Sequence, residues 1–260
     1  VSGDIAGVLR EKMRKAYGND FHVIYQPAAA GCQSPRDLVR GYGDTTDGWH
    51  EDTCEMLAER LFVAQRDAKR YEVESSPVLK HATFKVKAPR RKVTEQEVAA
   101  AEKELSELLS KKTQAELFAD FLAYTKAKEA KGGPGPYDSK KLPFVSADVA
   151  KAVIARGKNQ LTKPDLEFEV NVMRLGDVAF VTCPFELYLV YGQIIKARSL
   201  AKQTFVMELC NGDYGYIPSP TVIKSRSYGS GVNNGELGPD GGYVYCDAAV
   251  DAINAFFKEK

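Results

Sequence analysis

An apolar strand, an amphipathic helix and a second apolar strand follow one another in the last third of the chain, and this order constrains the fold more than any other feature. Val178–Cys183 is apolar and ends at Pro184, which cannot continue the hydrogen bonding of a strand. Apolar residues then recur at helical spacing up to Arg198, and residues 204–209 are again apolar and β-branched. The sequence therefore predicts an α/β fold with mixed sheets flanked by helices.

Further periodic segments extend this prediction along the chain. Helices are expected at Asp4–Tyr17, 46–71, Glu95–Leu109, 113–130, 147–155 and 247–257. Strands are expected at 21–25 and 78–86, and 166–172 forms a hairpin with 177–182. The first helix is expected to have Ser2 or Asp4 as its N-cap and Gly18 as its stop. Residues 92–145 are interpreted as a helical hairpin excursion that ends in a Gly/Pro loop.

Charge and cysteine content exclude several classes of protein. Lys and Arg number 36 against 35 Asp and Glu, so the net charge of +1 favours neither nucleic acid nor an anionic membrane as the main partner. No apolar run reaches the roughly 18 residues that a transmembrane helix needs, which predicts no transmembrane segment. Five cysteines at no repeating spacing fit neither a disulfide framework nor a paired-cysteine zinc site, and they leave the compartment open.

Candidate site residues follow the two apolar strands. Glu186 is expected in the first turn of the helix after Pro184, where its carboxylate faces the positive end of that helix. The turn-rich residues 210–216 follow the second strand, at the position where open α/β sheets bind ligands. A glutamate oxygen suits a metal, but a tyrosine hydroxyl has a pKa near 10 and is a rare ligand. From the residues alone, Tyr216 is therefore interpreted as packing at a sheet edge.

The order of several motifs resembles the neutral ceramidases, the neutral/alkaline non-lysosomal family. The matching residues are Pro184-x-Glu186, Gly192, the segment 202–206, Asn211, Tyr216, Tyr228 and Gly238-Pro239. The resemblance implies a zinc-dependent amidase that hydrolyses the N-acyl bond of ceramide, or of a related N-acyl lipid, to a fatty acid and a sphingoid base. Zn²⁺ is the implied cofactor and the N-acyl lipid is the implied substrate.

The resemblance also implies roles for individual residues. Glu186 and Tyr216 are the implied zinc ligands beside two histidines, and Tyr228 is the implied substrate contact that hydrogen-bonds the developing oxyanion. Residues 26–36 resemble the family's Gly-Asp-x-Ser-Pro loop, in which Ser34 is the implied active-site serine. Cys32 stands where the family has the aspartate, so the sequence places a thiol near the expected site.

The resemblance extends from Val1 to about residue 257 and is weak through the middle of the chain. It implies that residues 1–260 form the C-terminal part of a ceramidase-like zinc hydrolase catalytic domain, without the immunoglobulin-like tail of longer members. In that arrangement both histidine ligands precede Val1, on an N-terminal part of the same domain. The family resemblance further suggests a secreted or periplasmic location.

Three other features of the sequence leave alternatives open. His50-Glu51-Asp52-Thr53-Cys54 nearly matches the metal-binding HExxH motif and puts His50 and Cys54 on one helical face, although a surface and core pair is the simpler interpretation. His22 and His81 are interpreted as solvated structural residues. The Gly-rich residues 229–235 are too irregular for a dinucleotide-binding motif and predict a flexible loop on the substrate side.

Two alternative functions come from other classes of protein. Cys32 or Ser34 could be the nucleophile of a metal-independent hydrolase. The chain could also be a non-catalytic lipid-binding or interaction module. A disulfide between Cys32 and Cys210 is a further possibility if the two loops converge.

Overall fold

The computed structural model describes residues 3–33, 49–68, 74–129 and 142–258, which fall into two compact units. The first unit contains the described residues up to 27, residue 33 and those from 49 to 77. The second contains residues 28–32 and the described residues from 78 onward. The candidate site lies in the second unit.

Two helices, α1 (Asp4–Tyr17) and α2 (Trp49–Asp67), pack together in the first unit. Leu9 and Met13 of α1 are buried with Ala58 of α2. Both helices confirm the predictions from periodicity, and α1 ends at Gly18 as expected. The N-cap of α1 is Gly3 without a side-chain cap, so the prediction of Ser2 or Asp4 at that position was wrong.

The predicted strand at residues 21–25 does not form. Phe21 and Val23 pack instead against the buried residues of the α1–α2 pair, and the Ile24 side chain between Val23 and Tyr25 is 95% exposed. The alternation of apolar residues in this short segment therefore reflects packing of Phe21 and Val23 against two helices. Periodicity alone does not distinguish this case from a half-buried strand.

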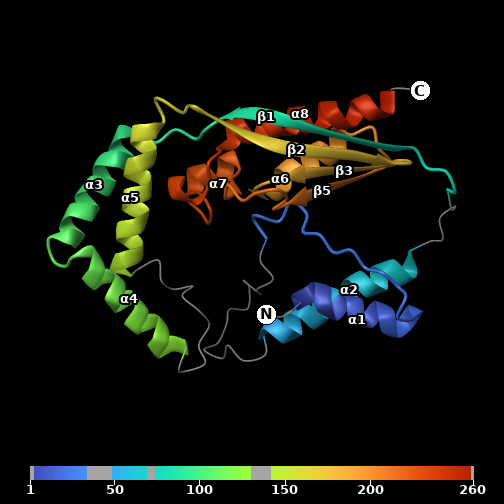
Figure 1. The fold of residues 1–260 in the computed structure, drawn as a ribbon, viewed down its shortest axis with the longest axis horizontal. Coiled ribbons are helices and arrows are strands. Elements are labelled where there is room, and N and C mark those ends of the chain that lie inside the picture. Colours follow the sequence, from blue (N-terminus) through green and yellow to red (C-terminus); the bar gives the residue numbers. More distant parts are fainter. Residues whose placement is uncertain (1–2, 34–48, 69–73, 130–141, 259–260) are drawn as a thin grey trace. The chain divides into compact units, whose positions relative to one another are not determined.

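A four-stranded sheet forms the centre of the second unit (Figure 1). Its strands lie in the order β1-β2-β3-β5, with bounds β1 Leu79–Pro89, β2 Asp165–Leu175, β3 Val178–Cys183 and β5 Gln203–Glu208. The first three strands are antiparallel, whereas β3 and β5 are parallel because α6 (Leu189–Arg198) crosses between them. The mixed sheet with helices confirms the predicted fold class, and the β2–β3 hairpin forms with Gly176 at positive φ in its turn.

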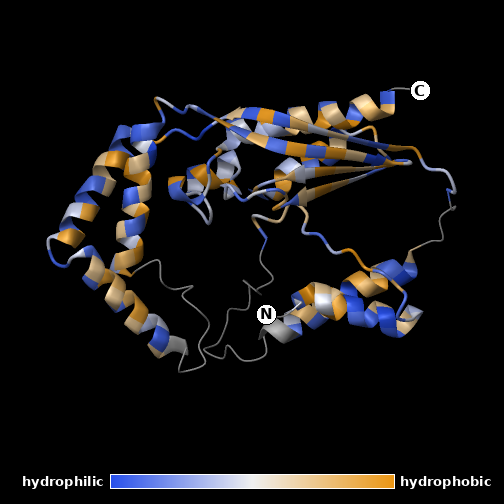
Figure 2. Ribbon diagram, viewed as in Figure 1, coloured by the Kyte–Doolittle hydropathy of each residue, from blue (hydrophilic) through white to orange (hydrophobic). Residues whose placement is uncertain are grey.

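One face of this sheet is buried, and the other is polar along β1 and β2, as the alternating hydropathy of these two strands in Figure 2 illustrates. On β3 and β5 the less buried face carries Phe180 stacked on Phe205. Alternate residues of β2 are buried, namely Leu166, Phe168, Val170 and Val172. On the opposite face Lys85 pairs with Glu167, and Thr83 donates a hydrogen bond to Asn171. His81 is exposed and contacts Asn171, so it is a solvated strand residue as predicted.

The last helix, α8 (Pro239–Lys258), packs along the buried face and contacts β1, β2, β3 and α6. The Tyr245 hydroxyl donates a hydrogen bond to the Thr182 carbonyl at 3.0 Å. The helix begins eight residues before the predicted start at 247, because two glycines in its first turns obscured the pattern. At Gly242 a Cβ atom would lie 2.7 Å from Tyr191 Cζ, so close packing requires glycine there.

The middle of the chain forms three helices, α3 (Glu95–Leu109), α4 (Gln114–Glu129) and α5 (Pro143–Asn159). Thr94 and Glu97 form a capping box at the start of α3. The two charged helices of the predicted excursion are thus confirmed, and α5 is longer than the expected 147–155. Figure 1 shows α5 running alongside α3, and α5 packs against both α3 and α4.

Candidate active site

The second unit contains a two-stranded parallel sheet made of β4 (Glu186–Leu187) and β6 (Tyr216–Ile217). In its register Glu186 lies directly opposite Tyr216. The two residues that the resemblance marks as zinc ligands are therefore neighbours. The prediction that Glu186 lies in the first turn of a helix was wrong, because α6 begins only at Leu189 with Tyr188 as its N-cap.

Backbone hydrogen bonds explain why the chain is extended at Glu186. The Glu186 N–H donates to the Gly215 carbonyl at 3.0 Å, and the Tyr214 N–H donates to the Pro184 carbonyl at 2.9 Å. The loop after β5 thus returns alongside the segment after β3. Helical periodicity after Pro184 could not reveal this pairing, since its partner lies far along the sequence.

Tyr216 lies between Glu186, its register partner, and Tyr228, its side-chain hydrogen-bond partner. The Tyr216 hydroxyl lies 3.0 Å from the Tyr228 hydroxyl, and the Glu186 carboxylate is close enough to raise the pKa of Tyr216. Either hydroxyl can be the donor in the contact between Tyr216 and Tyr228. The Tyr228 side chain is 63% exposed, which leaves it accessible from solvent. Three of the four predicted site residues therefore lie together.

Tyr188 and Gly229 hold the backbone of Tyr228 in place. The Tyr188 hydroxyl donates a hydrogen bond to the Tyr228 carbonyl. Gly229 has a φ of 72°, and a Cβ atom there would lie 2.6 Å from the Tyr188 hydroxyl oxygen. A side chain at this position would separate the two tyrosines. Burial is the main cause of the raised pKa of Tyr188, which keeps its hydroxyl protonated as a donor.

Glu208, at the end of β5, is a buried carboxylate whose side chain supports the site. Its Oε2 atom accepts the N–H groups of Ala30 at 3.1 Å and of Leu187 at 3.0 Å. Burial raises the pKa of Glu208 to about 7, although the two backbone hydrogen bonds oppose that shift. The nearby charge of Glu186 contributes to the same rise in the pKa of Glu208. Glu208 thus joins the segment 28–32 to β4.

The segment 28–32 brings Cys32 close to the start of α6. The Gly31 N–H donates to the Leu187 carbonyl at 2.9 Å, and a Cβ atom on Gly31 would lie 2.4 Å from the Glu186 carbonyl oxygen. Cys32 Sγ accepts the Leu189 N–H at 3.3 Å. The predicted proximity of this thiol to Glu186 is therefore observed. All five cysteines are free, so the possible disulfide between Cys32 and Cys210 is not formed.

Two predicted positions fall where the structure gives no description. Ser34 lies outside the described residues, and so does the side chain of His50, although Cys54 is buried in the α1–α2 pair. His22 is exposed, as expected for a structural residue. Among the described residues, no group of three or more His, Cys, Asp and Glu side chains could hold a metal ion.

Glu186 and Tyr216 fit part of a zinc site. Both offer oxygen donors, and their register across β4 and β6 makes the two residues direct neighbours. Burial raises the pKa of Tyr216, and its hydrogen bond to Tyr228 and the nearby Glu186 carboxylate act in the same direction. A cation at this position would have the opposite effect because positive charge favours the phenolate. A complete tetrahedral site requires further ligands from outside this pair.

Sequence reasoning missed two residues that shape this site, Glu208 and Tyr188. Glu208 had a detectable signal, since a carboxylate at the end of an apolar strand is expensive to bury without hydrogen-bond partners. Tyr188 had none, because its role depends on the backbone of Tyr228. The predicted loop at 229–235 lies beside the site, where Gly235 bridges to Gly215.

Comparison with known proteins gives a structural likeness and no sequence match. No family model matches the chain, and neither does any protein of curated function. The crystal structure of neutral ceramidase from Pseudomonas aeruginosa is similar over 99% of this chain, at 15% sequence identity and a TM-score of 0.55. A structure described as ceramidase complexed with C2 matches 35% of this chain and 15% of its own, at 17% identity and a TM-score of 0.32.

No described helix is long and apolar enough to cross a membrane.

The match to the Pseudomonas protein covers 41% of that longer chain, so the present chain spans less than half its length. Over nearly all of its length the chain has a fold similar to that of the neutral ceramidase, which confirms the resemblance at the level of the fold.

Proposed function

We propose that this chain carries part of the active site of a zinc-dependent amidase that cleaves the N-acyl bond of ceramide or a related N-acyl lipid. One observation carries the proposal: Glu186 and Tyr216 pair across β4 and β6, and Tyr228 contacts Tyr216. The fold likeness to a neutral ceramidase supports the same conclusion. The products would be a fatty acid and a sphingoid base.

Glu186 and Tyr216 would hold the zinc ion through their oxygens. When bound, zinc would lower the pKa of a water molecule toward 7 and polarise the substrate carbonyl. We place the remaining two ligands, both histidines, on a part of the same domain that precedes Val1. Glu208 and the segment 28–32 fix the backbone of β4, and so fix the position of Glu186.

Tyr228 is suited to stabilise the negative charge that develops on the carbonyl oxygen. Its hydroxyl is accessible, and its backbone carbonyl is held by Tyr188. A donor that is already in place does not have to reorganise as charge develops, which is the usual basis of oxyanion stabilisation. Ser34 would lie near the substrate head group, as the family resemblance implies.

The test is an assay of N-acyl sphingosines with short and long acyl chains, using protein that contains this chain together with the preceding part of its domain. We expect fatty acid release that a chelator abolishes and added zinc restores. Release that resists chelation but is lost to a thiol or serine reagent would instead indicate a hydrolase based on Cys32 or Ser34. Lipid binding without any release would indicate a non-catalytic module.

A further inference from the structure

A pocket of about 340 Å³ lies between α5 and the segment 230–236 in the second unit. Four cationic side chains line it, and Glu236 is the one carboxylate among its lining residues. The cations are Arg90, Arg91, Arg156 and Lys163. This size falls in the usual range of small-molecule sites, at roughly 300–1,000 Å³. The pocket therefore has the volume of a small-molecule site, and its lining residues carry the positive charge expected of an anion site.

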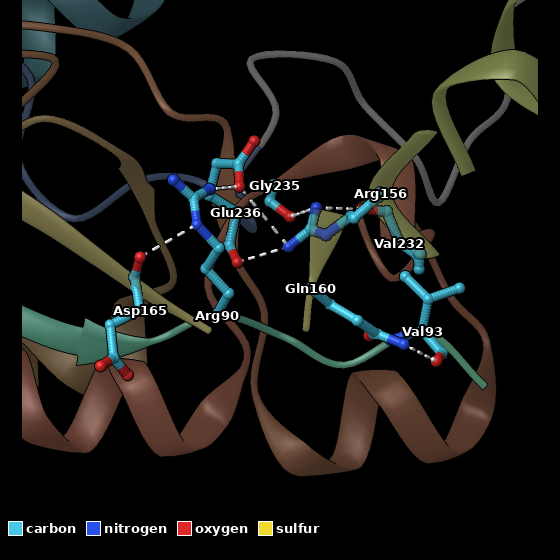
Figure 3. Close-up of polar contacts among 8 residues, drawn as sticks. All are labelled: Arg90, Val93, Arg156, Gln160, Asp165, Val232, Gly235 and Glu236. Carbon is cyan, nitrogen blue, oxygen red and sulfur yellow. Dashed lines mark hydrogen bonds and ion pairs between the residues drawn. The ribbon is translucent and has the colours of Figure 1, made fainter. Parts of the chain in front are cut away.

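Figure 3 shows the two best-connected arginines of this pocket. Arg156 donates to the backbone carbonyls of Val232, at 2.6 Å, Gly235 and Glu236. Its Nε atom is buried and has no hydrogen-bond partner among the described residues. Arg90 is paired with the Glu236 carboxylate. The single carboxylate is thus already engaged.

The pocket lining carries more positive than negative charge, because four cationic side chains face a single carboxylate. Desolvation and, to a smaller extent, repulsion from Arg90 and Arg91 together lower the pKa of Arg156 to about 10. Carbonyl dipoles offset this repulsion only in part, because a full negative charge interacts more strongly with a guanidinium. A bound anion would relieve the repulsion among the three arginines.

Lys163 provides the most informative side chain in the lining. It follows the end of α5, is exposed, and makes no side-chain hydrogen bond or ion pair within the part of the chain that is described. The arginines also hold the segment 230–236 in place. Replacing one of them would therefore disturb the fold as well as any anion binding, and the two effects would be difficult to separate. Lys163 has no such structural task.

Gln160 shows that the polar lining is fixed in place. Its side-chain oxygen accepts the Val93 N–H at 2.8 Å, and its amide donates to the Val93 carbonyl at 3.0 Å (Figure 3). These two bonds join the end of α5 to the segment that precedes α3. The pocket wall is therefore formed by tied elements, which limits the entropy lost when a ligand binds.

We propose that this pocket binds a phosphate monoester, with Arg91, Arg156 and Lys163 facing the phosphate group. Guanidinium groups match phosphate oxygens in pairs, and an ammonium adds a point charge. The pocket is distinct from the candidate active site, and the proposal does not depend on the proposed amidase activity. A free metabolite and a lipid headgroup present the same phosphate chemistry.

Calorimetric titration of the complete chain with inorganic phosphate and with glycerol 3-phosphate, at constant ionic strength in chloride, tests the proposal. We expect saturable binding at one site, weakened about tenfold or more by Lys163→Gln through the loss of a charge-assisted contact. Lys158→Gln is the matched control, because it removes the same charge from an exposed position on α5 outside the pocket. It should leave the affinity unchanged. Melting temperatures without phosphate verify that both variants are folded.

Absence of saturable binding in the parent chain would overturn the proposal. So would equal losses in the two lysine variants, which indicate non-specific attraction, or binding that Lys163→Gln does not weaken. Vesicles containing phosphatidic acid identify the source of the phosphate. Vesicle binding that glycerol 3-phosphate displaces and Lys163→Gln weakens supports a headgroup, whereas binding of the soluble ester alone supports a free metabolite.

Discussion

Glu186 and Tyr216 are direct partners across the parallel strands β4 and β6, and the nearby carboxylate contributes to the raised pKa of the tyrosine hydroxyl. A two-residue sheet has few backbone hydrogen bonds of its own. Its stability therefore depends on neighbouring groups, above all Glu208, which accepts the Leu187 N–H. The site residues and the groups that support them can be tested separately.

The zinc content of two forms of the protein tests the ligand assignment. We expect the 260-residue chain by itself to bind zinc weakly, because its described residues bring together only Glu186 and Tyr216 as oxygen ligands of the proposed site. A form that also includes the preceding part of the domain should bind zinc firmly. Elemental analysis after dialysis measures both. Tight equimolar zinc in the shorter form at another position, such as His50 and Cys54, would falsify the assignment.

Replacing Glu186 with Gln should lower zinc occupancy in the longer form. The change removes a charged ligand while it keeps the shape of the side chain, and charge is the larger part of carboxylate binding to a cation. Turnover of the N-acyl lipid should fall in parallel. The measurement is the zinc content per protein molecule, and circular dichroism checks that the variant is folded. Unchanged zinc occupancy would remove Glu186 from the ligand set.

Tyr228→Phe should reduce kcat by about 10² or more, or roughly 2.7–4 kcal/mol, with zinc content unchanged. The hydroxyl matters mainly when negative charge develops on the carbonyl oxygen. Steady-state kinetics on the preferred N-acyl substrate provide the measurement. Tyr243→Phe on α8 is the matched control, since it removes a hydroxyl from a partly exposed tyrosine outside the site. Wild-type turnover in Tyr228→Phe would show that the oxyanion role is wrong.

Glu208→Ala should destabilise the second unit by about 2–4 kcal/mol. It leaves the N–H groups of Ala30 and Leu187 without their acceptor, and each buried unsatisfied group costs about 1–3 kcal/mol. Glu208→Gln keeps an oxygen at this position and should lose less. Urea denaturation followed by fluorescence compares the two. Equal losses in both variants would indicate that the charge, and not the acceptor, is what matters.

The pH dependence of the same parent and Gln variant gives a second readout. Burial raises the pKa of Glu208 from 4.5 to about 7, so the folded state holds this proton more tightly than the unfolded state. The carboxyl therefore stabilises the parent most below pH 4.5, and this contribution is lost as the pH rises through about 7. The stability of the parent relative to Glu208→Gln should fall over that interval in metal-free buffer. A difference independent of pH would contradict the raised pKa.

Gly242→Ala should destabilise the protein even though alanine favours helices. A Cβ atom at this position would lie 2.7 Å from Tyr191 Cζ and 2.8 Å from Ile217 Cγ2, and overpacking of this kind costs about 1–3 kcal/mol. Gly7→Ala in α1 is the control, because nothing lies within 4 Å of its added Cβ. That variant should gain about 0.5–1 kcal/mol from helix propensity alone. Free energies of unfolding from denaturant titrations test both signs.

The sequence by itself determined the elements whose signals are local. The alternation of exposed and apolar residues predicted β1, a glycine turn between two strand segments predicted the β2–β3 hairpin, and helical periodicity predicted α1 and α3. These patterns are sufficient because each element buries one face, and the spacing of apolar residues along the chain records that face. The order of motifs also identified Glu186, Tyr216 and Tyr228 as residues to be considered together.

Only the tertiary structure decided how those residues meet. Periodicity placed Glu186 in a helix, whereas pairing with the distant Tyr216 makes it a strand residue. Gly242 weakens the local signal for α8, yet contact with Tyr191 and Ile217 requires a glycine there. Glu208 and Arg156 are held by hydrogen bonds to backbone groups of distant segments, and the amino-acid sequence does not indicate which backbone groups will be near. Contacts between distant segments outweigh local preferences because burial and hydrogen bonding there exceed the few tenths of a kcal/mol that separate local conformations.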